Sequence, residues 1–253
     1  MGLYYNEWIG FALKHAYFTS SSIRQKSVDL LQQLAENLSY QRVPFDPRRS
    51  ALLVLDVQRY FLEPESHAFI PSAPAILPGI RQLLEAYRNQ HLPIVLTQHL
   101  NSEGDAGVMS SWWRDLITVE NPLSEIEPEI QRLALSDQRS GNMQISKSAN
   151  QQSTIFIQKS QYDAFYRTQL EEILHAAGTA QVVICGVMTH LCCETTARSA
   201  FVRGFEVFFT VDGTATYNEH FHLASLLNLA HGFAVPVLVE EILASIEACD
   251  DQN

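Results

Sequence analysis

Short apolar runs recur along the chain from residue 51 onward, and amphipathic stretches separate them. The first run, Ala51–Val57 (ALLVLDV), is almost continuously apolar, which is typical of a strand buried on both faces of a parallel sheet. Five further runs share this character, at 92–97, 154–158, 181–185, 205–211 and 234–239. Helical stretches lie between them, near 78–89, 167–177, 192–203 and 218–231. This alternation predicts a three-layer α/β/α fold with a six-stranded, parallel, doubly wound sheet.

The first 45 residues precede this alternation and contain an amphipathic segment. Its apolar side chains recur at spacings of three and four, which gives a helix one apolar stripe. The stripe consists of Val28, Leu31, Leu34 and Leu38. Pro44 and Pro47 then end the pattern. We therefore predict a helical extension over 1–45 and one domain over 46–253.

This apolar stripe needs a surface to cover, because an isolated amphipathic helix is marginal in water. The surface is either this chain's own core or a second subunit, and we expect the second, in a dimer or higher homo-oligomer. The irregular stretch from about 99 to 153 resembles a lid or insertion. It contains Trp112 and Trp113, which either line a pocket or anchor a subunit contact.

Composition narrows the choice of partners. The chain has 253 residues, of which 46% are hydrophobic and 18% charged, as in an ordinary globular protein. Its formal net charge of -11 argues against nucleic acid and against an anionic membrane surface. A locally positive pocket for a small molecule is still compatible with this charge. No apolar run reaches the roughly 18 residues that a membrane span requires.

The four cysteines do not form a disulfide framework in a chain of this length. Cys192 and Cys193 are adjacent, whereas Cys185 and Cys249 lie apart, so there is no C-x-x-C pair. The first 18 residues carry Glu7 and Lys14 and no small-residue cleavage site, so we expect no secretory leader. A cytoplasmic location is the prediction that follows.

Three reactive side chains stand at the carboxyl ends of predicted strands, where open α/β sheets bind their ligands. They are Asp56, Lys159 and Cys192. Each residue alone has an ordinary structural interpretation. An aspartate at a strand end usually caps a turn, a lysine is usually solvated, and a buried cysteine usually packs in the core. Together they provide a nucleophile, a proton acceptor and a charge that orients it. Their coincidence therefore favours catalysis.

The segment from Cys185 to Arg198 (CGVMTHLCCETTAR) adds physical detail. Gly186 allows a sharp turn after the strand, and the next helix begins near Cys192. The partial positive charge at a helix start lowers a thiol pKa, and its free N–H groups can hold an oxyanion. Spacing alone does not choose between Cys192 and Cys193.

These segments resemble the isochorismatase-like hydrolase superfamily, which includes nicotinamidases, N-carbamoylsarcosine amidases and bacterial isochorismatases. The motifs that carry the resemblance are LLVLDVQRYF, IQKSQYDAF and GVMTHLCCETTARSAF, in the order typical of the family. The resemblance covers about residues 45–245. It implies a six-stranded parallel sheet between helix layers.

By this resemblance, the Asp-Lys-Cys triad of the superfamily corresponds to Asp56, Lys159 and Cys192. The pattern G-x-x-T-x-x-C, in register with Gly186 and Thr189, selects Cys192 and leaves Cys193 non-catalytic.

The same resemblance implies a non-proline cis peptide between Val187 and Met188. It also implies an oxyanion hole formed by the backbone N–H groups of Met188 and Cys192. The candidates for substrate binding are Phe61, Gln98, Trp113, Tyr162 and His190. Of these, Phe61 matches a pocket aromatic of the family, and His190 matches the GVYAH pattern of siderophore-type isochorismatases.

Two departures from the family change the expected chemistry. Nicotinamidases carry a metal motif beginning D-x-H, but the corresponding place here reads Thr97-Gln98-His99-Leu100. His220 and His222 are two residues apart and so point to different faces of a helix. We therefore expect no metal and no other cofactor.

The second departure concerns Cys192. Around the core the pattern is most similar to that of the siderophore-type isochorismatases, through DPRRSALLVLDVQRYF and IPSAPAILPGI. Those vinyl-ether hydrolases have glycine where this chain has Cys192. A thiolate there indicates attack on the carbon of an amide, imide or ureide.

The predicted function is therefore a cysteine hydrolase that cleaves a C–N bond of a small molecule through a thioester. One alternative is an isochorismatase-type vinyl-ether hydrolase in which Cys192 is a spectator. Another is a non-catalytic module that binds a partner, although a module has no need of all three reactive groups. A nucleotide-binding dehydrogenase is disfavoured, since no G-x-G-x-x-G follows the first strand.

Overall fold

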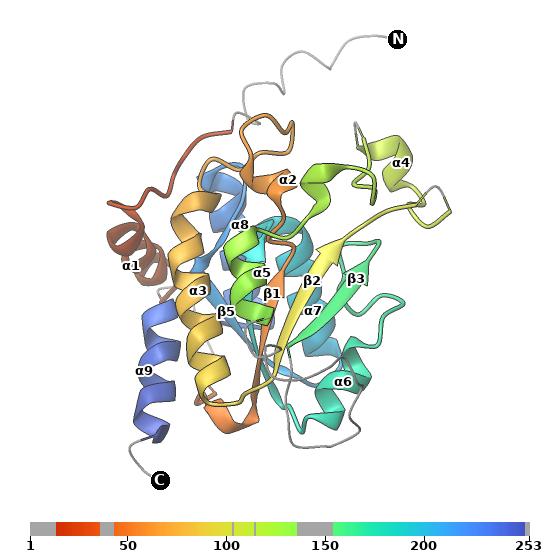
Figure 1. The fold of residues 1–253 in the computed structure, drawn as a ribbon. Coiled ribbons are helices and arrows are strands. Elements are labelled where there is room, and N and C mark those ends of the chain that lie inside the picture. Colours follow the sequence, from red (N-terminus) through yellow and green to blue (C-terminus); the bar gives the residue numbers. More distant parts are fainter. Residues whose placement is uncertain (1–13, 36–42, 103, 114, 136–153, 251–253) are drawn as a thin grey trace.

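Six parallel strands form one sheet in the order β3-β2-β1-β4-β5-β6 (Figure 1). Their bounds are Ser50–Leu55 (β1), Ile94–His99 (β2), Ile155–Lys159 (β3), Gln181–Val187 (β4), Glu206–Ala215 (β5) and Val235–Val237 (β6). The computed structural model describes residues 14–35, 43–102, 104–113, 115–135 and 154–250. The predicted six-stranded, doubly wound sheet is confirmed. Because the strand order reverses between β1 and β4, the crevice for a ligand lies at their carboxyl ends.

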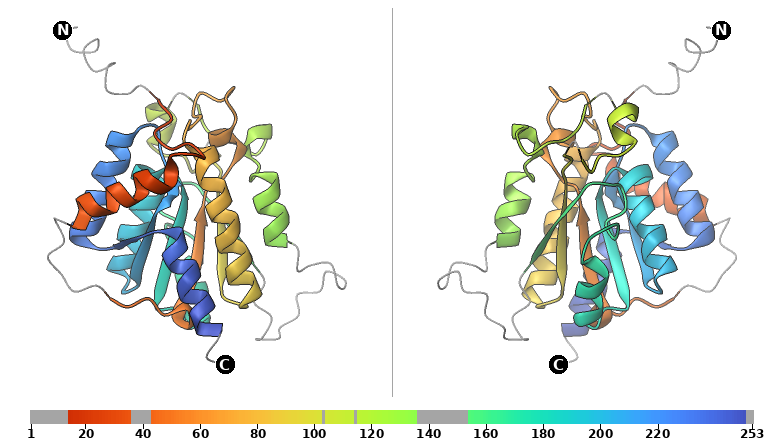
Figure 2. Two further views of the ribbon diagram at one scale, coloured as in Figure 1. Left: turned by 90° about the vertical axis from the view of Figure 1, so that its left-hand side faces the viewer. Right: turned by 90° about the vertical axis from the view of Figure 1, so that its right-hand side faces the viewer.

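Helices cover both faces of the sheet (Figure 2). One layer contains α3 (Ala73–Asn89), α5 (Pro128–Leu135) and α9 (Val239–Asp250), which pack through α3. The other contains α6 (Leu170–Ala176), α7 (Glu194–Val202) and α8 (Glu219–Gly232). The shorter elements are η2 (Pro47–Arg49), α2 (Arg59–Leu62), α4 (Met109–Trp112), η3 (Pro122–Ser124) and η5 (Thr189–Cys193). Among the described helices, none is long and apolar enough to cross a membrane.

The stretch expected to be a single irregular insertion contains a well-formed helix. In α5, Ile130, Leu133 and Ala134 are buried, and the helix packs on α3. Eight residues are too few for the periodic pattern to stand out in the sequence. The polar run 136–153 lies outside the described residues.

The N-terminal helix α1 (Ile23–Ala35) packs on its own chain, against β5 and α8. Leu30 and Leu34 are buried, and Val28 and Leu31 pack against the same core. The expectation that this stripe meets a second subunit is therefore wrong for the described part of the stripe. Leu38 lies outside the described residues. The side chain of Trp112 is exposed, so the segment that contains Trp112 and Trp113 remains the predicted oligomer contact.

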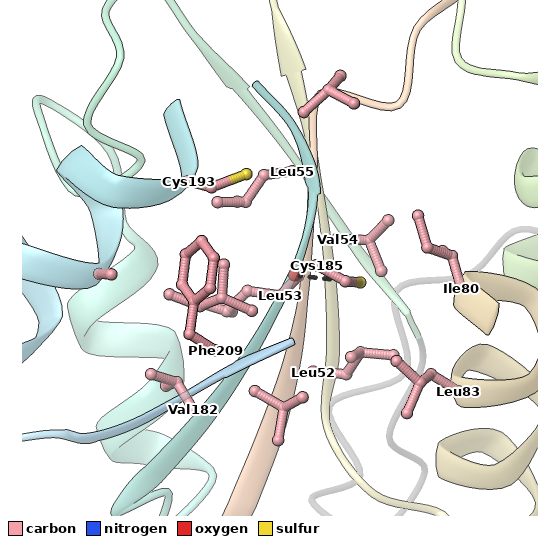
Figure 3. Close-up of a cluster of buried hydrophobic side chains, with 14 of the residues drawn as sticks. Leu52, Leu53, Val54, Leu55, Ile80, Leu83, Val182, Cys185, Cys193 and Phe209 are labelled. Atoms are coloured by element: carbon pink, nitrogen blue, oxygen red, sulfur yellow. Dashed lines mark hydrogen bonds between the residues drawn. The ribbon is translucent and has the colours of Figure 1, made fainter. Parts of the chain in front are cut away.

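Alternate side chains of β1 face the two helix layers, as strand geometry requires. Leu52 and Val54 point toward α3, whereas Leu53 and Leu55 point toward α7 (Figure 3). All four are almost fully buried. This two-sided burial explains why the sequence of β1 is almost continuously apolar.

Gly186 allows β4 to pass close to the end of β1. Its φ is +119°, and a Cβ atom added there would lie 2.1 Å from the carbonyl oxygen of Leu55. The pairing of β4 with β5 also shifts register between Ile184 and Gly186. A side chain at this position would push η5 away from β1.

We expect Gly186→Ala to lower the free energy of unfolding by about 3 kcal/mol or more, because it combines a backbone clash with an unfavourable φ. Urea unfolding followed by circular dichroism measures the change. Gly232→Ala is the matched control, because no atom lies within 4 Å of the added methyl. The control should change stability by less than about 1 kcal/mol. Equal stability of the two variants would contradict the role assigned to Gly186.

Candidate active site

The structure brings together the three reactive side chains predicted from strand ends. Asp56 follows β1, Lys159 ends β3, and Cys192 lies in η5 directly after β4. Lys159 Nζ lies 2.6 Å from Asp56 Oδ2 and 3.4 Å from Cys192 Sγ. The side chains of Asp56 and Lys159 have no solvent exposure, and Cys192 is 5% exposed.

The backbone of Asp56 has a conformation that few residues other than glycine adopt. Its φ is +52°, in the left-handed region that aspartate tolerates better than most residues. The hydroxyl of Thr97 donates a 2.7 Å hydrogen bond to Asp56 Oδ1 and accepts one from the Asp56 N–H at 3.1 Å. Thr97 thus fixes the carboxylate so that its other oxygen faces Lys159.

The ammonium of Lys159 has three protons and four nearby acceptors. Asp56 takes one proton, and the carbonyl of Gln161 takes another at 2.9 Å. The third faces Cys192 Sγ at 3.4 Å and His99 Nδ1 at 3.5 Å. The lysine therefore links the carboxylate, the thiol and an imidazole.

Gln58, two residues after Asp56, holds the neighbouring strand in place. Gln58 Oε1 accepts a hydrogen bond from the His99 N–H at 2.8 Å, and Gln58 Nε2 donates to the His99 carbonyl at 3.0 Å. Gln58 Nε2 also donates to the Ser124 carbonyl at 2.7 Å. Gln58 thus continues the pairing of β1 with β2 after β1 has ended.

The charges of the group follow from burial and from these contacts. Burial, the largest single influence, raises the pKa of Asp56, but Lys159 and the other groups around the carboxylate together outweigh it, and the pKa lies below its ordinary value. Burial alone would lower the pKa of Lys159, but Asp56 and Cys192 raise it above its ordinary value. Burial, and then Asp56, raise the pKa of Cys192 well above that of a free thiol. The resting group is therefore a carboxylate, an ammonium and a neutral thiol, whose sulfur lies within 4.8 Å of a carboxylate oxygen.

The two adjacent cysteines have different surroundings. Cys192 lines a pocket, whereas Cys193 has no exposure and points into the core toward Leu55 (Figure 3). Cys185 lies on the other side of the sheet, and its thiol faces the Leu53 carbonyl at 3.7 Å. Of these three thiols, only that of Cys192 opens onto a ligand site.

The pocket beside Cys192 is small, and several aromatic side chains contribute to its lining. Its volume is about 60 Å³, room for roughly four or five water molecules. Its aromatic lining consists of Tyr60, Phe61, Trp113, Tyr162 and Tyr217. The indole of Trp113 donates to the Tyr162 hydroxyl at 2.7 Å. The candidates Phe61, Trp113 and Tyr162 all line this pocket.

Two other substrate-binding candidates do not line the pocket. Gln98 points to the opposite side of β2 and donates to the Ser124 carbonyl at 2.9 Å. His190 Nδ1 lies 2.6 Å from the Thr216 hydroxyl, and its ring stacks on Phe221. The predictions for Gln98 and His190 are corrected accordingly. The pocket contains instead His99 and Asn101, which sequence reasoning did not select.

The backbone before the nucleophile candidate also reaches the pocket. The Val187–Met188 peptide bond is cis, and Met188 lines the pocket with Cys192. The Met188 carbonyl accepts hydrogen bonds from the N–H groups of Leu191 and Cys193, which close the turn of η5. This turn presents Cys192 toward Asp56.

One cluster of possible metal ligands exists among the described residues. Asp56, His99 and Cys192 offer ligand atoms within 4.8 Å of one another. However, Lys159 Nζ lies within 3.5 Å of an atom of each of them. A buried ammonium repels a second cation and occupies the lone pairs that a metal would need. These residues do not fit a metal ion while Lys159 is charged.

Comparisons with known proteins identify one family model and several similar proteins. A model of the isochorismatase domain matches residues 50–241. Nicotinamidase 3 of Arabidopsis thaliana is 37% identical over 199 residues, which cover 78% of this chain and 88% of that protein. Enterobactin synthase component B of Escherichia coli (strain K12) is 28% identical over 201 residues, or 79% of this chain and 64% of that protein.

Solved structures show the same fold. A cysteine hydrolase from Pseudomonas syringae pv. phaseolicola 1448A superposes with a TM-score of 0.70 at 23% identity, covering 82% of this chain and 96% of that one. Nicotinamidase PncA from Bacillus subtilis superposes with a TM-score of 0.65 at 17% identity, covering 75% of this chain and 99% of that one.

We expect Lys159→Met to lower the free energy of unfolding at pH 7 by about 3–5 kcal/mol, because it leaves a buried carboxylate unpaired. Without Lys159, burial raises the pKa of Asp56 in the folded state above its unfolded value, so the loss should shrink as the pH falls toward 4. In the wild type the pair stabilises the fold above the unfolded pKa of Asp56 and below that of Lys159.

Urea unfolding between pH 4 and pH 9 measures this dependence. The double variant Asp56→Asn/Lys159→Met, which removes both charges, is the control and should be less destabilised than Lys159→Met alone. A loss in Lys159→Met that does not change with pH would contradict the assigned charges.

Proposed function

The chain belongs to the isochorismatase family, and from this premise we propose that it is a cysteine hydrolase of small amides, imides or ureides. The observation that carries the proposal is the Cys192 thiol, which opens onto a small pocket and lies beside a carboxylate that Lys159 keeps ionised. A thiol next to a general base is the arrangement that covalent catalysis requires.

In the first half of the proposed reaction, Asp56 takes the proton of Cys192 as the sulfur attacks the carbonyl carbon. The new C–S bond places a negative charge on the carbonyl oxygen. Backbone N–H groups of Met188 and Cys192 would hold this oxyanion. Losing one such donor typically costs about 10²–10³-fold in kcat.

In the second half, protonated Asp56 gives its proton to the leaving nitrogen, and the C–N bond breaks. An amine or ammonia leaves, and the acyl group remains on Cys192 as a thioester. Asp56 then takes a proton from water, which attacks the thioester. The acid product leaves, and the thiol regains its proton from Asp56.

The pocket favours a flat substrate of modest size. Five aromatic side chains line it, and its volume excludes polymers. The 37% identity to a nicotinamidase makes nicotinamide the first substrate to test. Ureides and imides with the same planar C(=O)–N group are the next.

A vinyl-ether hydrolase is the second candidate, because the chain is 28% identical to enterobactin synthase component B. That chemistry needs no thiol, whereas here the thiol faces both the carboxylate and the pocket. A non-catalytic module is disfavoured because a buried ion pair is expensive to build and stabilises a fold poorly.

A hydrolase screen tests the proposal. Nicotinamide, other small amides, ureides and isochorismate are assayed in parallel, with ammonia and pyruvate as readouts. We expect ammonia from an amide or ureide. We expect Cys192→Ala to abolish its release, and Cys193→Ala to keep it if the protein folds.

Mass spectrometry after brief iodoacetamide treatment should find Cys192 modified before Cys193, with activity lost in step. Isochorismate cleavage that persists in Cys192→Ala would establish the second candidate instead.

We also expect turnover to need no metal, because the ammonium of Lys159 lies among the clustered ligand atoms. Exhaustive treatment with a chelator, followed by the same ammonia assay, measures this. Unchanged turnover agrees with the proposal. Turnover that is lost and then restored by zinc, manganese or iron would overturn it.

A further inference from the structure

His99 is a buried imidazole beside the proposed triad, and the reaction described above does not use it. It is 6% exposed, ends β2, and pairs in register with Lys159 on β3. We propose that His99 is a positioning residue, which fixes the direction of the Lys159 ammonium as a neutral hydrogen-bond acceptor. This inference rests on the proposed cysteine hydrolase function.

The hydrogen-bond network assigns the tautomer of His99. Asn101 Nδ2 donates to the Ser160 carbonyl at 2.9 Å, so the amide oxygen of Asn101 faces the other way. That oxygen lies 2.9 Å from His99 Nε2 and can only accept. Nε2 therefore carries the proton, and Nδ1 has a free lone pair toward Lys159, 3.5 Å away.

Burial and the Lys159 ammonium keep the ring neutral against the two carboxylates of Asp56 and Asp105. Asp56 faces it from β1, Lys159 from β3, Cys192 from η5 and the exposed Asp105 from the loop after β2. Burial first, and then the Lys159 ammonium, lower the pKa of His99 below that of a free imidazole. A neutral ring attracts the ammonium, whereas a charged one would repel it.

The chemistry explains why the lysine needs this acceptor. One ammonium proton is shared between Cys192 Sγ and His99 Nδ1, at 3.4 and 3.5 Å. When the sulfur becomes part of a thioester, it accepts a hydrogen bond poorly. His99 then keeps a partner for that proton, so Lys159 stays aligned with Asp56 while water attacks.

Two substitutions separate the two ring nitrogens. The amide of asparagine reaches about as far as Nδ1, and the amide of glutamine about as far as Nε2. His99→Asn therefore keeps an acceptor for Lys159 and loses the contact with Asn101, whereas His99→Gln does the reverse.

We expect His99→Gln to lower kcat on the order of 10- to 100-fold with little change in KM, since small misplacements cost this much. His99→Asn should stay within a few-fold of the wild-type kcat. Equal losses in both variants, or a rise in KM alone, would show that His99 fills space or contacts substrate, and would overturn the proposal.

The pH dependence of kcat in Asn101→Asp is a further test, because it would not change if His99 had only a structural role. A carboxylate at position 101 stabilises the imidazolium of His99 and places a second cation against Lys159. We expect kcat to fall as the pH drops through the raised pKa of His99, a limb that the wild-type profile lacks. Identical pH profiles would contradict the proposal.

Nitrogen-15 NMR of histidine-labelled full-length protein tests the tautomer without any substrate. The resonances of His99 are identified by their loss in His99→Asn. We expect an unprotonated Nδ1 and a protonated Nε2 from pH 6 to pH 8. A protonated Nδ1 or a cationic ring at pH 7 would overturn the proposal. A wild type that hydrolyses no amide would refute the proposed function alone, because this measurement still tests the role of His99.

Discussion

An ammonium and a carboxylate face each other at 2.6 Å without solvent exposure, and the arrangement of the site depends on this pair. Removing two such ions from water costs several kcal/mol each, so the pair persists only where the remaining protons and lone pairs find partners. The Thr97 hydroxyl donates a hydrogen bond to the second carboxylate oxygen of Asp56, and the Gln161 carbonyl accepts one from Lys159. The uncharged thiol of Cys192 and the ring of His99 complete the shell. In the proposed reaction, the carboxylate that these partners hold in place is the group that takes the proton of the thiol.

The sheet order explains why these partners come from β2. Lys159 and Asp56 belong to strands that are not adjacent, since β2 lies between β3 and β1. Thr97 and His99 are two residues apart on β2, so both side chains project to the same face, toward the charged pair. Gln98, between them, projects away. Gln58 joins the end of β1 to the backbone of His99, which keeps these strand ends in register.

The segment before the matched family region also supports the site. Residues 14–35 precede the domain match at 50–241 and pack on the same chain. Tyr17 and Phe18 pack on the buried ring of His222, whose Nδ1 lies 3.0 Å from the hydroxyl of Thr189 in η5. Lys14 donates to the His67 carbonyl at the rim of the pocket. The N-terminal segment thus contacts elements that shape the pocket and the turn bearing Cys192.

The sequence by itself determined the alternation of strands and helices, because side-chain periodicity is a local property of each segment. It also placed Asp56, Lys159 and Cys192 at one edge of the sheet, because the carboxyl ends of parallel strands share that edge. The family resemblance already selected Cys192 over Cys193, but only the tertiary structure shows where the side chains of adjacent residues point. The π-helical turn η5 directs Cys192 to the pocket and Cys193 to the core. On β2, side chains alternate between the two faces of the sheet, so His99 points into the site and Gln98 points away from it. The tertiary structure also decided that the α1 stripe covers its own core and that His190 stacks on Phe221. The pattern of a segment specifies which face is apolar, but the neighbours that fill the space against that face come from distant parts of the chain.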